Sequence, residues 1–93
     1  MAVLVTPDGK ETKVQPRGKR WGLEELQEHV GGYIEKMPGV EPTILFDEDG
    51  KRKNLPFNAK ATQRVNALLE GQVLRYIPQL VGNVLFLEPG EKL

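Results

Sequence analysis

Turn-forming residues divide this chain into short segments. Proline and glycine mark turns or breaks at residues 7–9, 38–39 and 89–90, and a glycine pair stands at residues 31–32. Proline lacks a backbone N–H donor and glycine adopts backbone conformations that other residues avoid, so both interrupt regular structure. The helices and strands between these points can only be short. We therefore expect a small sheet with short helices rather than a long helix or a large barrel.

Apolar or alternating runs between the turns predict strands. In chain order these strands are residues 2–6, 12–15, 33–37, 43–46, 51–53 and 84–87. Residues 73–77 fit either a strand or a helical turn. Residues 47–50 are expected to join two of the strands as a hairpin, with Gly50 at a position of positive φ. The sheet should therefore have five or six antiparallel strands.

Two short amphipathic helices are also predicted. Leu23, Leu26 and Val30 share one face of the first helix, and the glycine pair 31–32 ends it. Asn58 is expected to cap the N-terminus of the second helix. The apolar residues at helical spacing and the closing glycine of that helix are Ala61, Val65, Leu68 and Gly71. The predicted fold class is α+β, with both helices packed on one side of an antiparallel sheet.

The length and hydropathy of the chain predict one domain. It has 93 residues, the size of a single domain with a modest core. We expect one domain over residues 1–93, an ordered core over about residues 2–88, and a short C-terminal tail at 89–93. Its longest apolar stretch is much too short to span a bilayer, and no signal peptide is apparent. These features predict no membrane contact and a cytoplasmic location.

The residue types present argue against most catalytic chemistries. The chain has no Cys and no Ser, and His29 is its one histidine. Thiolate sites, Ser-based hydrolysis and a His-rich zinc centre are therefore excluded within one chain. Glu25 could orient His29 as a base, but no nucleophile accompanies the pair. We expect no catalytic residue, no metal and no cofactor.

Charge is patterned although the net charge is zero. Residues 1–20 carry a net charge of +3, residues 21–50 carry −7, and residues 51–75 carry +5. These blocks could pair within the fold, pair between two chains, or form separate positive and negative faces. The modest core and zero net charge favour a homo-oligomer, most simply a dimer. The acidic block and the small number of aromatic residues argue against nucleic-acid binding.

Three sequence pieces carry a resemblance to a known family. They are the block at residues 23–35, with leucines, Gln27, two glycines and Ile34; the segment at residues 54–58; and the closing run at residues 81–87. In this order they resemble domain of unknown function 3846, a family of short phage and plasmid proteins, over about residues 2–88. Family members often place Arg after the motif asparagine, where this chain has Ala59. The resemblance implies a mobile-element setting, chiefly phage, with the host cytoplasm as the location. The family name records no activity, so the resemblance implies no mechanism.

A small anionic or nucleotide ligand is the expected partner. Its predicted site lies where the glycine turn meets the second helix, and its residues are Gly31, Gly32, Tyr33, Asn58, Lys60 and Arg64. The alternative is that Asn58 only caps the helix and Tyr33 only packs. The predicted function is a non-enzymatic phage-type binding protein that sequesters a nucleotide-derived host signal or blocks a host defence component. The competing prediction is a regulatory module whose acidic block binds a host nucleic-acid enzyme.

Overall fold

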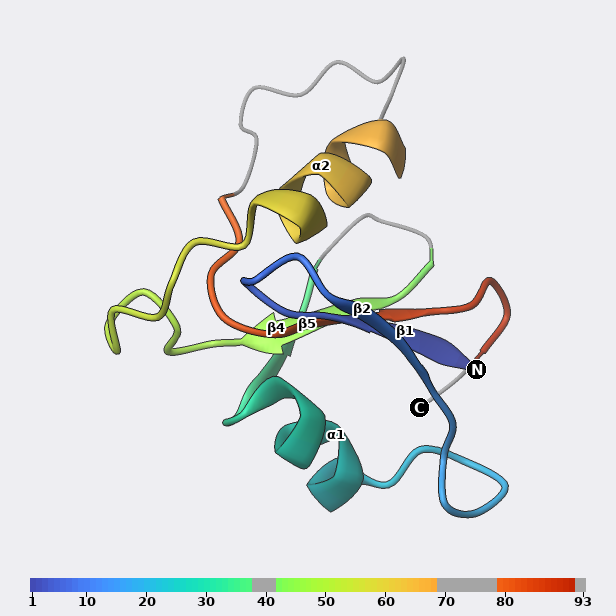
Figure 1. Cartoon of the computed structure of the whole chain (residues 1–93). Coiled ribbons are helices and arrows are strands. Elements are labelled where there is room, and N and C mark those ends of the chain that lie inside the picture. Colours follow the sequence, from blue (N-terminus) through green and yellow to red (C-terminus); the bar gives the residue numbers. More distant parts are fainter. Residues whose placement is uncertain (38–41, 69–78, 92–93) are drawn as a thin grey trace.

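A computed structural model describes residues 1–37, 42–68 and 79–91. Its five strands form one antiparallel sheet in the order β2-β1-β5-β4-β3. Two helices complete the fold, and Figure 1 shows the arrangement. In chain order the elements are β1 (Ala2–Val5), β2 (Glu11–Val14), α1 (Leu23–Val30), β3 (Ile34–Lys36), β4 (Ile44–Asp47), α2 (Ala59–Leu68) and β5 (Val84–Leu87). The predicted α+β class and the antiparallel sheet are confirmed.

The last strand of the sequence lies at the centre of the sheet. β5 pairs with β1 on one side and with β4 on the other. All four of its residues are buried. Because side chains of a strand alternate between two faces, a strand that is apolar at every position needs cover on both faces.

The two helices provide that cover from opposite faces, so the prediction that both pack on one side is wrong. Val84 and Phe86 of β5 belong to the cluster that includes Ala61 and Val65 of α2. The alternate residues of β5 and their partners on α1 form the second cluster, which includes Leu85, Leu87, Leu26 and Val30. In Figure 1, α2 lies above the sheet and α1 lies below it. The physical reason is the uninterrupted apolar run of β5. With both helices on one side, the apolar side chains on its other face would be exposed to water.

The predicted strand at residues 51–53 is also absent. Those residues form turns, in which the Lys53 N–H donates to the Asp49 carbonyl and the Asn54 N–H donates to the Lys51 carbonyl. Gly50 does not have positive φ, whereas Asn54 has a φ of 56°. Gly50 provides space instead, since a Cβ there would lie 2.9 Å from Val81 Cγ2. The ambiguous segment 73–77 and Gly71 lie outside the described residues.

Helix α1 has the predicted boundaries but a different buried face. Gly31 ends it with a φ of 92°, in the left-handed conformation expected of a C-cap glycine. Leu26 and Val30 are buried as predicted, whereas Leu23 is 61% exposed. Trp21, which precedes the helix, is buried in the same cluster instead. In the described part of the chain, neither helix has the length and hydropathy needed to cross a bilayer.

Candidate functional site

The turn that follows α1 packs against the end of β4. A Cβ at Gly32 would lie 2.6 Å from Asp47 Oδ2 and 2.7 Å from Lys53 Nζ. Only a glycine leaves room for this contact, so Gly32 is required for space where Gly31 is required for conformation. The glycine pair thus serves two purposes, and one of them is to admit a charged pair close to the backbone.

Asp47 is the acidic member of that pair, and its side chain is 1% exposed. Its Oδ2 accepts a hydrogen bond of 2.8 Å from Lys53 Nζ, and its Oδ1 accepts one of 2.8 Å from the Asp49 N–H. Burial acts to raise the pKa of the Asp47 carboxyl. The hydrogen bonds from Lys53 and Asp49 outweigh burial, so this pKa lies below its ordinary value of 3.8. Asp47 is therefore held as a carboxylate.

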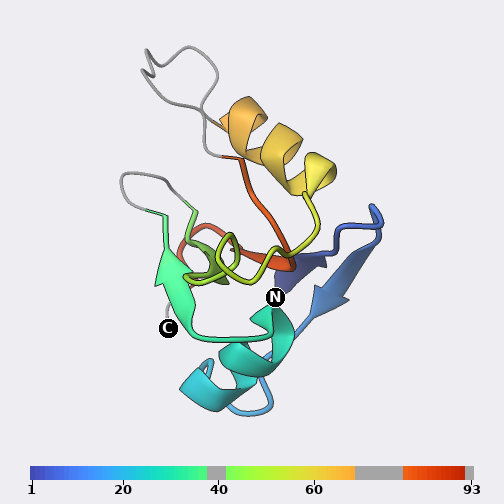
Figure 2. The same cartoon turned by 90° about the vertical axis from the view of Figure 1, so that its left-hand side faces the viewer.

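The loop between β4 and α2 presents the basic members of this region. Figure 2 shows residues 48–57 at one end of the sheet, between the two helices. The side chain of Lys53 is 43% exposed although its ammonium group touches Asp47. Arg52 is 80% exposed and pairs with Asp49 at 3.0 Å. Both cations can thus be reached from solvent.

Tyr33 follows Gly32 directly, and it is 68% exposed. Its carbonyl accepts a hydrogen bond from the Glu48 N–H, which fixes its backbone against the basic loop. Lys53 Nζ lies against Gly32, and the exposed ring of Tyr33 belongs to the next residue along the chain. We call Gly32, Tyr33, Arg52 and Lys53 the basic-loop site. It presents a ring face and two cations, a set of groups suited to an anionic ligand that carries a ring.

The structure does not bring together all six residues of the predicted site. Asp47 pairs with Ile34 in the β3–β4 ladder, and Ile34 packs in the α1 cluster, so the glycine turn lies on the α1 face. The other predicted residues lie in or just before α2, on the opposite face of the sheet. A single ligand would therefore meet only one of the two groups. The ligand-binding role of either group stays a prediction.

Asn58 is fully buried and its amide group is occupied by the fold. Its Nδ2 donates to the Val5 carbonyl at 2.9 Å and to the Gly82 carbonyl at 2.8 Å. Its Oδ1 accepts from the Ala61 N–H at 3.0 Å, the N-cap contact that the sequence predicts. Asn58 therefore joins α2, β1 and the segment before β5.

Lys60 and Arg64 are the two basic residues of α2. The guanidinium of Arg64 pairs with Glu11 of β2 at 3.0 Å and lies 4.9 Å from the ring centroid of Phe86. Lys60 is exposed. Arg64 thus connects α2 to the edge of the sheet, which is a structural contact that the sequence did not reveal.

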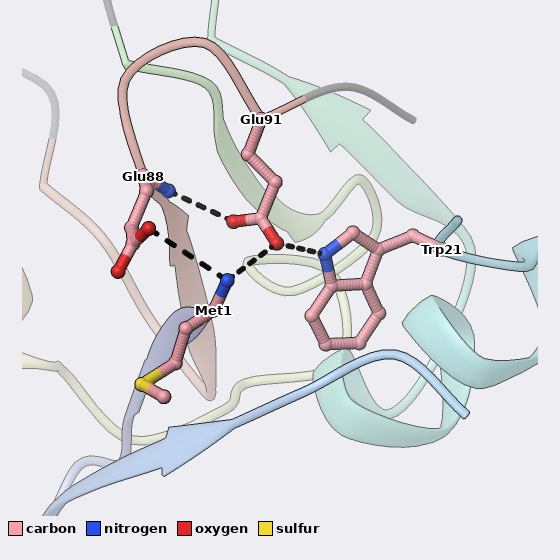
Figure 3. Close-up of polar contacts among 4 residues, drawn as sticks. All are labelled: Met1, Trp21, Glu88 and Glu91. Carbon is pink, nitrogen blue, oxygen red and sulfur yellow. Dashed lines mark hydrogen bonds and ion pairs between the residues drawn. The ribbon is translucent and has the colours of Figure 1, made fainter. Parts of the chain in front are cut away.

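A second polar cluster lies where the N-terminal strand meets the C-terminal turn (Figure 3). One carboxylate oxygen of Glu91 accepts from the Met1 amino group at 2.9 Å and from Trp21 Nε1 at 2.8 Å. Its other oxygen accepts from the Glu88 N–H at 2.9 Å. Nothing in the sequence near residues 89–91 indicates this role, because a Pro-Gly turn with an acidic residue is typical of a solvated tail.

The Glu91 cluster shifts the pKa of Glu91 and that of the Met1 amino group. Burial acts to raise the pKa of Glu91, but the hydrogen bonds from the Met1 amino group, Glu88 and Trp21 lower it below its ordinary value of 4.5. The hydrogen bond to Glu91 raises the pKa of the Met1 amino group above its ordinary value of 8.0. Both shifts favour the ion pair.

His29 has no orienting carboxylate in the described structure. Its ring makes an edge contact with Trp21, with centroids 5.9 Å apart. Glu25, which could have oriented it, instead accepts from the Arg17 N–H at 2.7 Å and the Gly22 N–H at 3.3 Å. Glu25 therefore holds the loop that leads into α1. The arrangement gives no support to a His29–Glu25 pair as a catalytic base.

Comparison with known proteins places this chain in a family. No curated protein and no solved structure matches the chain. A family model described as a domain of unknown function (DUF3846) matches residues 1–92, nearly the whole length. The chain therefore belongs to the DUF3846 family.

Proposed function

We propose that this protein binds an anionic, ring-bearing small molecule at the basic-loop site and acts without catalysis. A nucleotide-derived signal has this chemistry, and its sequestration in the cytoplasm of a phage's host would counter a host defence. The observation that carries the proposal is the close approach of the Lys53 ammonium to Gly32, the residue that precedes the exposed Tyr33.

Arg52 can turn to a ligand at small cost. Arg52 and Asp49 form a surface ion pair, and such pairs contribute about 0–1 kcal/mol. A phosphate group offers the guanidinium two acceptor oxygens, which makes a stronger contact than the exposed carboxylate. Lys53 can add a further charged hydrogen bond, and Tyr33 can stack on the ring.

The competing function, an acidic surface that binds a host enzyme, has weaker support. Several residues of the acidic block have partners within the same chain, since Glu28 pairs with Arg17 at the surface and Asp47 pairs with Lys53. Glu25 is also occupied by backbone N–H groups. The charge blocks therefore pair at least in part within one chain.

The test is a thermal-shift screen with a panel of nucleotides, followed by titration of the best ligand. Tyr33→Ala and Lys53→Ala should each weaken binding by about 1 to 3 kcal/mol, the range for a lost stacked ring or charged hydrogen bond. Lys10→Ala, which removes an exposed lysine of the β1–β2 turn, should bind like the wild type. Arg64→Ala tests the α2 residues of the original prediction and should also bind normally.

Asp47→Asn is the matched control for Lys53→Ala, because both break the same ion pair. Asp47→Asn leaves Lys53 unneutralised, so an anion should bind at least as tightly as in the wild type. Lys53→Ala removes the cation and should weaken binding. If the two variants lose affinity equally, the ion pair only stabilises the loop and the basic-loop site is not the ligand site. A panel that shifts neither the wild type nor Asp47→Asn overturns the proposal.

A further inference from the structure

Strand β2 forms one edge of the sheet. It pairs with β1 on one side, and within the described residues no strand pairs with its other side. An edge strand presents backbone N–H and C=O groups that a further strand can bind. β2 is therefore a surface on which a partner can continue the sheet.

The register of the β1–β2 hairpin shows which groups face outward. Thr6 lies opposite Lys10, and the Thr6 N–H donates to the Lys10 carbonyl at 3.0 Å. Since hydrogen-bonded pairs alternate along an antiparallel ladder, Thr12 directs its backbone groups toward β1. Glu11 and Lys13 then direct their N–H and C=O groups away from the sheet.

We propose that β2 pairs with β2 of a second copy of this chain, antiparallel and around a two-fold axis at Thr12. Glu11 would exchange two backbone hydrogen bonds with the partner subunit's Lys13, and the symmetric pair would make two more. The two five-stranded sheets would become one continuous sheet. Interfaces of this kind are isologous, because the same strand serves both subunits.

Charge selects this register over its neighbours. With Thr12 opposite the partner's Thr12, each Glu11 lies directly opposite a Lys13. A shift by two residues in either direction keeps the backbone groups matched but opposes Glu11 to Glu11 or Lys13 to Lys13. Opposite charges across a pair of strands stabilise it and like charges destabilise it. The zero net charge of the chain also leaves self-association unopposed.

The other edge of the sheet lacks this complementarity. β3 has only three residues, and the Met37 N–H donates to the Ile44 carbonyl of the neighbouring strand. By the same alternation, Ile34 and Lys36 direct their backbone groups outward. No register of β3 against itself that matches these outward-facing backbone groups opposes two unlike charges. The partner we propose is therefore a second copy at β2 and not at β3.

Sedimentation of the full chain tests the interface. The wild type should be dimeric at tens of micromolar. Lys13→Glu places like charges opposite each other twice and should raise the dissociation constant about tenfold or more. Lys36→Glu makes the same charge change at the β3 edge and should leave the dimer intact. A wild type that sediments as a 10.4 kDa monomer at this concentration overturns the proposal, as does equal weakening by both variants.

An introduced cysteine tests the register directly, because the chain has no Cys of its own. Thr12 and the partner's Thr12 would form a non-hydrogen-bonded pair with Cα atoms about 4.5 Å apart, within disulfide range. Thr12→Cys should therefore form a covalent dimer on mild oxidation. Lys13→Cys places the two thiols out of reach and should stay monomeric on a denaturing gel. Cross-linking of both variants to the same extent would contradict the Thr12 register.

Discussion

The two helices are held to the sheet by different means. Helix α2 is held by Asn58, a neutral amide that lies wholly inside the protein and bonds to three separate backbone segments. The segment before α1 is held near the molecular surface, where the Glu91 carboxylate accepts hydrogen bonds from Trp21, from the Glu88 N–H and from the Met1 amino group. Both side chains connect distant parts of the sequence, but only one of them is charged.

The difference follows from the cost of burying charge. An amide can be buried at small cost once its donors and acceptor are paired, whereas a buried carboxylate loses much more hydration. The carboxylate accordingly lies at the edge, where Glu91 keeps 15% of its side chain exposed. It follows that the anchor of α2 should be insensitive to pH and that of α1 should depend on pH.

The largest effect is expected from Asn58→Ala. It removes the helix cap and leaves the Val5 and Gly82 carbonyls without their buried donor, so the free energy of unfolding should fall by about 3 kcal/mol or more. Urea denaturation measures this loss. Asn66→Ala, at an exposed asparagine of the same helix, should change the stability by less than about 0.5 kcal/mol. Similar losses at the two positions would show that the buried amide is not the anchor.

Glu91→Ala should have a smaller effect, because two of its three partners, the Met1 amino group and the Glu88 N–H, belong to exposed residues and can bond to water. We expect the free energy of unfolding to fall by about 1–2 kcal/mol, since the loss includes charged hydrogen bonds to Trp21 and the amino group. The change in Trp21 fluorescence on unfolding gives the measurement. A loss as large as that of Asn58→Ala would show that the partly exposed Glu91 carboxylate stabilises the fold as much as the buried Asn58 amide.

Gly31→Val tests the other end of α1, which is set by backbone conformation alone. Apart from the neighbouring residues in the chain, no described atom lies within 4 Å of a Cβ built at Gly31, so the cost comes from its φ of 92°. A β-branched residue in that conformation should lower the free energy of unfolding by about 1 kcal/mol or more. Gly18→Val, in a loop without positive φ, should cost less. Equal losses would contradict the assigned end of the helix.

The smallest expected effect is the pH dependence of the stability that the Glu91 cluster contributes. The folded pKa of Glu91 lies below 4.5, so its contribution is present above that pH and is lost as the pH falls through the folded pKa. The folded pKa of the Met1 amino group lies above 8.0, so its contribution is present below pH 8.0 and is lost as the pH rises through the folded pKa.

Thermal unfolding of wild type and Glu91→Gln between pH 3 and 10 checks this dependence. The variant should have a flatter profile at both ends, while Asp47 keeps some acid sensitivity in both proteins because its pKa is also lowered. Asn58→Ala, if it folds, should keep the wild-type profile. Parallel profiles for wild type and Glu91→Gln would show that the Glu91 ion pair does not contribute.

Local signals in the sequence predicted most of the elements, and long-range contacts explain the errors. The Gly31 C-cap and the Asn58 N-cap depend on neighbouring residues, and both were predicted. The placement of α1 and α2 on opposite faces depends on where β5 inserts, which no local pattern reveals. For the same reason the sequence predicted Asn58 as a cap but not its bonds to Val5 and Gly82.

The candidate site was predicted only in part. The glycine pair suggested a close approach at Gly32, and the structure places Lys53 and Asp47 there. The hairpin predicted for residues 47–53 assigned Lys53 to a strand, so its pairing with Asp47 was missed. The role of Glu91 gave no signal in the sequence, because Trp21 and Met1, which it connects, are 70 and 90 residues away.

The central position of β5 has a consequence for the order in which the protein can fold. The β1–β2 and β3–β4 hairpins are local and can form as soon as they are synthesised, but β1 and β4 have no partner between them until β5 emerges. Contacts between residues far apart in sequence slow folding, because the intervening chain must first be ordered. During synthesis the inner edges of both hairpins are open to other chains, which makes this interval the one in which aggregation competes with folding.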